Sequence, residues 1–439
     1  MRATMPATAV LPPDDPQRFE LHNEVHARPS ARVRLPALVV HVAVLNAGVD
    51  RATECAHLRM LPGQAGLEVA DLNANFLRLR LGARLVKWER HTEVTRYTLV
   101  QALPAQAAPP ASDPELLSAL ALPDGWLQAI PGRTVAAIKL VMLHADLGDP
   151  HAALDAARHW FGERPVVASL MGRGHSMAVT DFQLRPTGFE RILVLAPEAT
   201  TETRAGRILQ RLLELETYRM MALRGLPVAK SLAPMLGECE TALADITARL
   251  ETRRDSDEAL LATLIALAAR VERASAEHMG RFSATAAYAA IVQQRLGELR
   301  ELPIQGTQTI GEFMQRRLSP AIATVASTAQ RLAALSQRIA RTSALLRTRV
   351  DIAAEAQNRQ LLAKLTRGQE LQLRLQRTVE GLSIAAISYY VVSLVLYAGK
   401  AASEAGLPVR PELAAGLAIP FVLLGVAWLT RRIRRHLEA

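Results

Sequence analysis

The chain has 439 residues, a formal net charge of +10, 50% hydrophobic residues and only 4% aromatic residues. This composition excludes a disordered tail protein and a disulfide-stabilised secreted module, and the length suits two or three domains. Cys55 and Cys239 lie far apart without a CxxC pair or Cys/His cluster, which argues against a disulfide framework or a structural zinc finger. No nucleophile–base pair, phosphate loop or metal quartet has usable spacing. We therefore expect a protein that is not a conventional enzyme and holds no cofactor.

The positive charge is unevenly distributed along the chain. Residues 1–300 contain 34 basic and 33 acidic residues, whereas residues 301–439 contain 18 and 9. This excess flanks apolar segments and does not form a compact basic module with aromatic or groove-reading elements. We therefore expect no nucleic-acid partner, and the distribution favours membrane lipid as the partner of these basic residues.

Two uncharged apolar runs near the C-terminus predict membrane-spanning helices. Residues 382–399 read LSIAAISYYVVSLVLYAG, and residues 413–430 read LAAGLAIPFVLLGVAWLT. As a helix, each run would be about 27 Å long, close to the thickness of the hydrocarbon core of a bilayer. A lipid-embedded helix tolerates Pro420, and residues 400–412 suit a short outer loop. The alternative is a pair of buried core helices in a soluble protein.

Arginines predict the orientation of this hairpin. Arg374 and Arg377 precede the first run, and a basic tail, 431–439, follows the second, against Lys400 and Arg410 in the loop. By the positive-inside rule both termini are cytoplasmic. The first residues lack the apolar core of a signal peptide, so we expect the long segment before the first run to stay in the cytoplasm. The tail residues expected at the lipid headgroups are Arg431, Arg432, Arg434 and Arg435.

Residues 1–200 predict a cytoplasmic mixed α/β domain. Between residues 33 and 196, about seven short apolar or period-two runs are typical of strands. Residues 185–188 predict a hairpin turn, and residues 175–176 a tight turn into a strand. Helical spacing occurs at residues 113–121 and 151–161.

From residue 201 the apolar period becomes helical. A helical middle region, 201–318, ends with a short helix that Thr309 and Glu312 cap. Its longer helical segments are 203–224, 228–252 and 256–300. A stalk, 319–381, has apolar residues near heptad spacing and can continue unbroken into the first span. Polar residues at several heptad positions favour packing in a larger bundle over a free two-stranded coil.

The predicted fold class is therefore α+β, with a mixed α/β N-terminal domain followed by a long helical stalk and a C-terminal two-helix transmembrane hairpin. The predicted boundaries are 1–200, 201–318, 319–381, 382–399, 400–412, 413–430 and 431–439.

Four segments carry a family resemblance. They are HNEVHARP (22–29), GHSMAVTDF (174–182), GRILQRLLELETYRMMALRGLP (206–227) and TVEGLSIAAISYYVV (378–392). Together and in this order they resemble a bacterial family of uncharacterised membrane-anchored proteins, domain-of-unknown-function family 3422. The resemblance implies a protein of the bacterial inner (cytoplasmic) membrane and implies no activity.

The order of the parts also resembles the CorA-type magnesium channels, which join a cytoplasmic α/β domain through a long stalk helix to two spans and a basic tail. Those channels are oligomeric, so the resemblance implies self-association and an ion pathway. Their Gly-Met-Asn motif is missing, because the corresponding stretch here reads Tyr397-Ala398-Gly399-Lys400. No ion-binding role is therefore carried over to any residue.

The HNEVHARP segment contains a candidate metal set. His22, Glu24 and His26 share one face if the segment is extended. Imidazole and carboxylate groups are common metal ligands, although the order is not that of an HExxH motif. The alternative is a structural role, in which these side chains hydrogen-bond a strand or a helix terminus.

The first span carries a weakly polar stripe. Ser383, Tyr390, Ser393 and Tyr397 recur near three- and four-residue spacing. Small and hydroxyl side chains often pack helices together in membranes, and the same stripe in an oligomer could line a pore. The sequence is compatible with both roles, helix packing and pore lining.

We expect an inner-membrane-anchored protein that forms homo-oligomers through its stalk and first span, with a CorA-like ion channel or transporter as one function. The alternative is a membrane-tethered scaffold or regulatory module that binds a cytoplasmic partner. One hairpin leaves no lumen of its own, so conduction would require several subunits.

Overall fold

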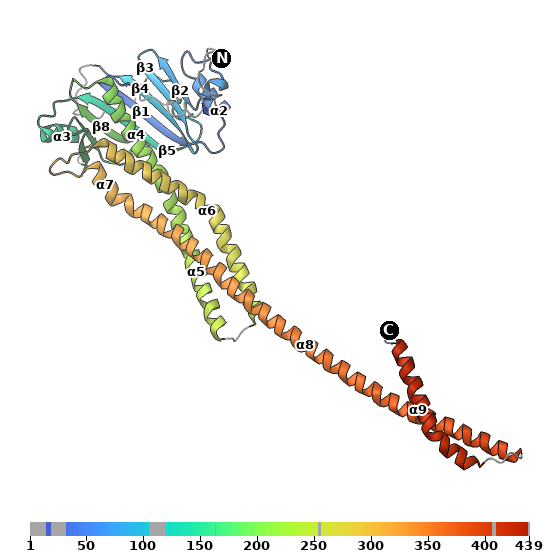
Figure 1. The fold of residues 1–439 in the computed structure, drawn as a ribbon. Coiled ribbons are helices and arrows are strands. Elements are labelled where there is room, and N and C mark those ends of the chain that lie inside the picture. The colour runs from blue at the N-terminus through green and yellow to red at the C-terminus, as the bar shows by residue number, and fades with distance from the viewer. Residues whose placement is uncertain are drawn as a thin grey trace, which may run out of the picture. The chain divides into compact units, whose positions relative to one another are not determined.

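In the computed structural model, the N-terminal part of the chain forms an eight-stranded sheet (Figure 1). It describes residues 15–18, 32–104, 120, 122–162, 164–252, 256–405 and 410–437. The strands are β1 (Ala37–Leu45), β2 (Phe76–Leu81), β3 (Arg84–Arg90), β4 (Val94–Ala102), β5 (Arg133–His144), β6 (Val167–Met171), β7 (Ser176–Thr180) and β8 (Glu190–Ala196). Their order is β2-β3-β4-β1-β5-β8-β7-β6, and only the β5–β8 pair is parallel.

The helices follow the same chain order. They are α2 (Arg51–Arg59), the short 3-10 helix η1 (Val69–Leu72), α3 (Pro150–Arg158), α4 (Glu202–Leu223), α5 (Gly225–Thr252), α6 (Asp257–Leu299), α7 (Ile310–Arg317), α8 (Ser319–Glu404) and α9 (Pro411–Leu437). This arrangement of a sheet followed by long helices confirms the predicted fold class.

Two hydrophobic cores cover the two faces of the sheet. Side chains alternate along a strand, so Leu38 and Val40 of β1 lie in one core with residues of α2 and α3. Ala37 and Val39 lie in the other core, together with residues of α4, α6 and α7. Burial on both faces explains why β1 is apolar at every position except His41 and does not alternate with polar residues.

The number of strands differs from the predicted seven. Residues 84–100, which resemble one long run, fold back as the β3–β4 hairpin. The His91 N–H donates to the carbonyl oxygen of Val94 at 2.8 Å, and no glycine or proline marks this turn in the sequence. The predicted turn at 185–188 is confirmed, because the Gly188 N–H donates to the Arg185 carbonyl at 2.9 Å. The predicted helix 113–121 lies outside the described residues except for Leu120.

The junction between α4 and α5 requires a glycine. The first helix ends at Leu223, and the second begins at Gly225, where the sequence predicts a stop. A Cβ atom on Gly225 would lie 2.3 Å from Oγ1 of Thr285 in α6 and 3.3 Å from Cγ1 of Val325 in α8. The absent side chain therefore lets three helical segments approach closely.

The predicted capping box and long helix are both confirmed. Thr309 Oγ1 accepts from the Glu312 N–H at 3.0 Å, and a Glu312 carboxylate oxygen accepts from the Thr309 N–H at 2.9 Å. After this short helix, α8 runs for 86 residues and includes the whole first predicted span. Along its first part, Val325, Leu332 and Ile339 are buried, as the heptad-like spacing predicts.

The chain divides into two compact units, residues 1–254 with 262–341 and residues 255–261 with 342–439. Within the second unit, α8 continues to Glu404 and α9 begins at Pro411. A Cβ atom on Gly399 would lie 3.3 Å from Cα of Pro411, so the two helices approach closely at this end. Pro420 lies inside α9, as predicted for the second run.

Candidate functional site

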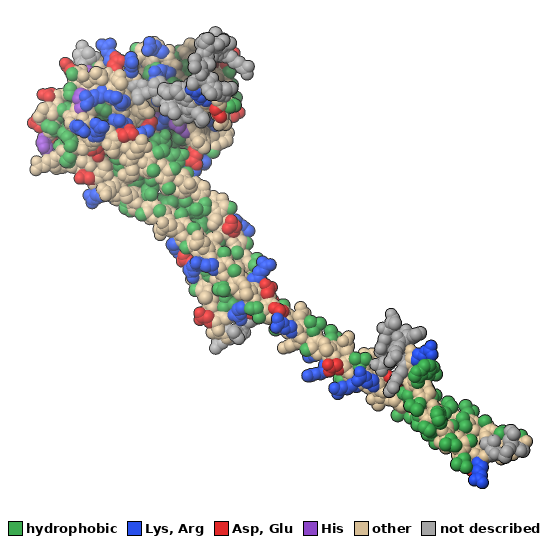
Figure 2. Space-filling model, viewed as in Figure 1, with side chains coloured by type: hydrophobic (Ala, Val, Ile, Leu, Met, Phe, Trp, Pro, Cys, Tyr) green, Lys and Arg blue, Asp and Glu red, His purple; other side chains and the backbone are tan. Residues whose placement is uncertain are grey.

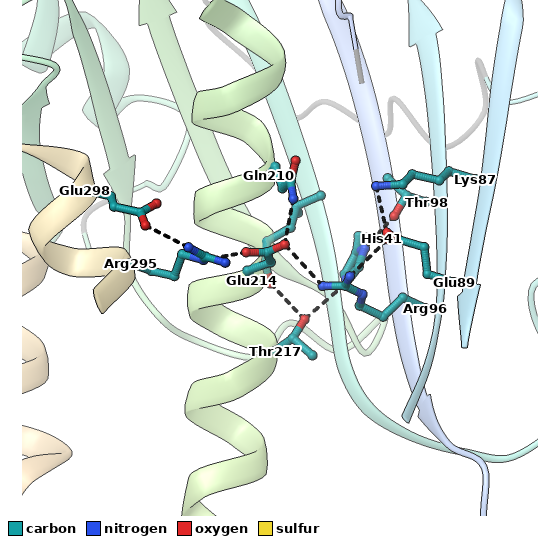
Figure 3. A network of polar contacts seen from close by, with 11 residues as sticks. His41, Lys87, Glu89, Arg96, Thr98, Gln210, Glu214, Thr217, Arg295 and Glu298 are labelled. Carbon is teal, nitrogen blue, oxygen red and sulfur yellow. Dashed lines mark hydrogen bonds and ion pairs between the residues drawn. The ribbon is translucent and has the colours of Figure 1, made fainter. Parts of the chain in front are cut away.

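Charged and polar side chains fill part of the space between the sheet and α4 (Figure 3). The members are His41 of β1, Lys87 and Glu89 of β3, Arg96 and Thr98 of β4, Gln210, Glu214 and Thr217 of α4, and Arg295 and Glu298 of α6. We call this set the buried polar network. All of its members lie in the first compact unit.

Strand register brings the sheet residues of the network together. His41 lies opposite Thr98 on the neighbouring strand, and Glu89 lies opposite Arg96. His41 follows Ala37 and Val39 at two-residue steps, so its side chain takes the sheet face that α4 covers. On the helix, the four- and three-residue steps between Gln210, Glu214 and Thr217 place them on one face.

Ion pairs of alternating sign connect the sheet to α6. Glu89 contacts Lys87 at 2.9 Å and Arg96 at 3.1 Å. A second nitrogen of Arg96 lies 3.7 Å from Glu214, which also accepts from Nε of Arg295. Since Arg295 lies on α6, this chain of contacts joins two strands and two helices.

The central charges of the network are almost fully removed from solvent. Glu89, Arg96 and Glu214 are only 3%, 4% and 5% exposed. Burial opposes ionisation of Glu89, but Arg96 and Lys87 hold the pKa of its carboxyl below the usual range. These mutual pairings compensate the desolvation of the charges, so removal of Glu89, Arg96 or Glu214 would leave an uncompensated buried charge.

His41 is the neutral member of the network. Burial, assisted by the positive charge of Arg96, lowers the pKa of His41 to about 3. Its two ring nitrogens lie 2.8 Å from Oγ1 of Thr98 and 3.1 Å from Oγ1 of Thr217. The imidazole therefore bridges the sheet to α4 through hydrogen bonds and carries no charge at neutral pH.

The cavity in this network is small. Its volume is about 30 Å³, and it is lined by network residues such as Lys87 and Glu214 together with apolar residues of α4. This is room for about one water molecule, not for a substrate. The network therefore suits a role in fixing α4 on the sheet better than a role in catalysis.

A second cluster of buried carboxyl groups lies between β8 and α4. Arg219 contacts Glu190 at 3.0 Å and also contacts Glu216. Burial, together with the negative charge of Glu216, raises the pKa of Glu190 above its usual range. One guanidinium is thus shared by two carboxyl groups in a desolvated position.

The sequence did not indicate either cluster. The signal available was the interruption of apolar strand runs by charges, as in VKWER (86–90) and VTRYT (94–98). A charge inside a strand is more often a solvent-facing residue, and only strand register shows that these charges face each other.

The predicted metal set cannot be placed, because His22, Glu24 and His26 lie outside the described residues. Within the described ranges, no group of three or more His, Cys, Asp or Glu side chains could hold a metal ion.

The polar stripe of the first span lies on α8. Ser383, Tyr390 and Tyr397 are exposed, and Ser393 is half-buried. The hydroxyl of Ser393 donates to the carbonyl oxygen of Tyr389 in the same helix at 2.9 Å. The stripe therefore makes little contact within the chain, and its predicted role in packing or pore lining stays a prediction.

The four tail arginines all lie in the last turns of α9. The guanidinium of Arg432 lies over the ring of Trp428, 5.1 Å from the centroid. The side chains of Arg431, Arg434 and Arg435 lie outside the description.

Two helices are long and apolar enough to cross a membrane by length and composition, namely the end of α8 and residues 411–430 of α9. Only 6% of each apolar window is buried in the chain. Neither window is therefore packed as a core helix among the described residues. A buried core helix was the alternative to a transmembrane helix.

The family comparison supports the sequence resemblance. A family model described as "Protein of unknown function (DUF3422)" matches residues 13–437. No curated protein and no solved structure matches the chain, and the likeness to CorA-type channels stays a prediction. Because the family model covers nearly the whole length, the chain belongs to the DUF3422 family of proteins of unknown function.

Proposed function

We propose that this protein is a membrane-anchored scaffold that self-associates through α8 and carries its α+β domain in the cytoplasm. The observation that carries the proposal is an apolar stripe on α8. It lies C-terminal to the part of α8 that packs in the first compact unit. The stripe consists of Leu361, Leu365, Leu375, Val379 and Leu382, and each of these side chains is more than half exposed. We call it the α8 stripe.

The spacing of the α8 stripe is that of a coiled-coil seam. Steps of four and three residues connect its members, with Gly368 and Gln372 at the two intermediate positions. In the first unit, the same type of spacing places Val325, Leu332 and Ile339 in the interior. Heptad spacing without intrachain cover supports a partner helix for the α8 stripe.

A second copy of the chain is the partner that suits this stripe best. The α8 stripe leads directly into the first apolar window, at Leu382. If the window spans the bilayer, every copy has the same orientation and height, so identical stripes meet in parallel and in register. An unrelated partner would need a matching helix at the same height.

Membrane anchoring rests on the two apolar helices and their flanking arginines. We place both termini in the cytoplasm, because arginines precede the first window and follow the second. Trp428 with Arg432 over its ring suits the interface between hydrocarbon and headgroups. The protein would then be a multi-pass protein of the bacterial cytoplasmic membrane with lipid contacts at its basic tail.

We assign the cytoplasmic domain no catalytic step. Its buried polar network is self-paired around a cavity of water size, which suits a rigid binding platform. Its partner would be a cytoplasmic protein.

Cysteine cross-linking tests the proposed self-association. Both native cysteines, Cys55 and Cys239, are buried, so a single introduced cysteine would report on its own position. We expect Leu375→Cys to form a disulfide-linked dimer in membranes under mild oxidation. The matched control is Leu373→Cys, which is similarly exposed but about 200° further round the helix. Equal dimer yield at both positions, or none at residue 375, would reject the seam.

An ion pathway is a second candidate, and one observation favours it. Ser383, Tyr390 and Tyr397 leave hydroxyl-bearing side chains exposed on the α8 surface of the first apolar window. In an oligomer with several copies of this helix, that surface could line a pore. We expect ion flux into proteoliposomes that Ser383→Leu reduces. If common cations and anions leak equally with and without the protein, the ion pathway is rejected and the scaffold is the remaining proposed function.

A further inference from the structure

A basic pocket of about 250 Å³ lies beside the start of α4. Its walls come from the β6–β7 turn, the first turns of α4 and the end of α6. The Gly172 N–H donates to the Leu299 carbonyl at 2.8 Å, and the Arg173 N–H donates to the Arg300 carbonyl at 3.3 Å. Backbone hydrogen bonds thus fix the turn against the end of α6.

Arginines dominate the lining of this pocket. Arg204, Arg207 and Arg211 recur at three- and four-residue steps, so they share one face of α4, and Arg300 adds a fourth guanidinium. Figure 2 shows Lys and Arg side chains gathered over the surface where α4 begins. The pocket therefore concentrates positive charge from two separate segments of the chain.

The one lining carboxylate does not balance this charge. Glu298 accepts from Nε of Arg211 at 3.1 Å and also pairs with Arg295 of the buried polar network at 2.9 Å. Among the described residues, no carboxylate pairs with Arg204, Arg207 or Arg300. Four guanidinium groups against one shared carboxylate leave a formal surplus of about three positive charges in the pocket.

The arginine nearest the turn is partly withdrawn from water. Arg204 is half-buried, and a Cβ atom on Gly172 would lie 3.9 Å from its Nη2 atom. A counter-ion stabilises a partly desolvated cation, and converging like charges repel each other. An anion in the pocket would compensate both effects.

We propose that this pocket binds a compact phosphate-bearing anion of the pyrophosphate type. The planar guanidinium fork matches two phosphate oxygens, and several forks from different directions suit an anion with more than one negative charge. A volume of about 250 Å³ admits a diphosphate group but not a nucleic-acid helix. The proposal is independent of membrane anchoring and self-association.

Calorimetric titration of the full-length, detergent-purified protein with inorganic pyrophosphate tests the site. We expect saturable binding that weakens as salt is added, because mobile ions screen the contacts. Arg207→Gln should weaken binding about tenfold, since it removes one charge-assisted contact. Its side chain is exposed, so the variant should fold normally. Arg204→Gln should weaken binding at least as much.

The matched control is Arg158→Gln, which removes an exposed arginine of α3 outside the pocket. This variant should bind pyrophosphate as tightly as the unaltered protein does. No saturable binding to the unaltered protein, or equal losses in the control and the pocket variants, would overturn the proposal.

Competition then identifies the source of the phosphate. Vesicles that contain phosphatidic acid should displace pyrophosphate if the natural ligand is a lipid headgroup. If they compete no better than pure phosphatidylcholine vesicles, the site takes a soluble phosphorylated molecule.

Discussion

Arg96 is the side chain whose loss should damage the α+β domain most clearly. It is 4% exposed and lies between Glu89 at 3.1 Å and Glu214 at 3.7 Å. Arg96→Met keeps much of the side-chain volume but leaves two buried carboxylates with one cation fewer. Breaking a buried ion pair on one side costs about 3–5 kcal/mol, so we expect a loss of this size in the free energy of unfolding.

The loss should depend on pH in a defined direction. In the unaltered protein, burial opposes ionisation of Glu89, but Arg96 and Lys87 keep its pKa below the usual range. The stabilisation from this pairing is fully present above the pKa that Glu89 has in the unfolded chain. It is lost as pH falls through the lower pKa that Glu89 has in the folded protein. Without Arg96, burial should raise the pKa of Glu89. The difference between the two proteins should therefore be largest near neutral pH and shrink toward pH ~4.

Urea unfolding of the full-length protein in detergent measures this loss. Trp88, Trp126 and Trp160 are buried in the core on the other face of the sheet, so tryptophan fluorescence reports the unfolding of the α+β domain. The control is Arg158→Met, which breaks an exposed ion pair with Asp155 and should cost at most about 1 kcal/mol. If Arg96→Met lay within about 1 kcal/mol of the unaltered protein, the network would not hold the domain together as we describe.

Three further predictions concern single positions. Gly132→Ala should destabilise the protein by about 2 kcal/mol or more in thermal melts, because φ is +116° and the new Cβ would lie 2.5 Å from the Leu45 carbonyl oxygen; an unchanged melting temperature would contradict this. The pKa of His41 is about 3 in the folded protein and about 6.5 in the unfolded chain, so between these values only the unfolded chain binds the proton. The free energy of unfolding should therefore fall as pH drops below ~6.5. His41→Gln should make this pH dependence weaker, as measured by urea midpoints across the pH range. Thr309→Ala removes the cap that bonds the Glu312 N–H and should cost about 1 kcal/mol, whereas a loss near zero would mean that the capping box adds nothing.

Much of the fold could be predicted because local patterns dominate it. The apolar run of β1 and the Thr309 capping box each have a signal within a few residues, and α8 follows Pro320 as a long run without a further proline. The β3–β4 hairpin has none. Its turn contains no glycine or proline, and the charges of Glu89 and Arg90 beside it continue the strand pattern instead of breaking it.

The candidate sites could not be predicted because they depend on distant segments. Glu89 meets Glu214 only through Arg96, and the pocket joins the β6–β7 turn to residues of α4 and the end of α6. Neither spacing nor composition shows which strand registers and helix faces coincide. The arginine steps along α4 were visible in the sequence, but an arginine stripe on a helix is usually a solvated face.

The mass of the detergent-purified protein tests the central claim, self-association through the α8 stripe, most directly. We expect light scattering to give a protein mass that is a multiple of the 47.8 kDa chain. Leu375→Glu places a charge in the seam and should shift that mass toward a single chain, whereas Leu373→Glu, outside the stripe, should leave it unchanged. A single-chain mass for the unaltered protein at working concentration, or an oligomer that withstands Leu375→Glu, would contradict the account.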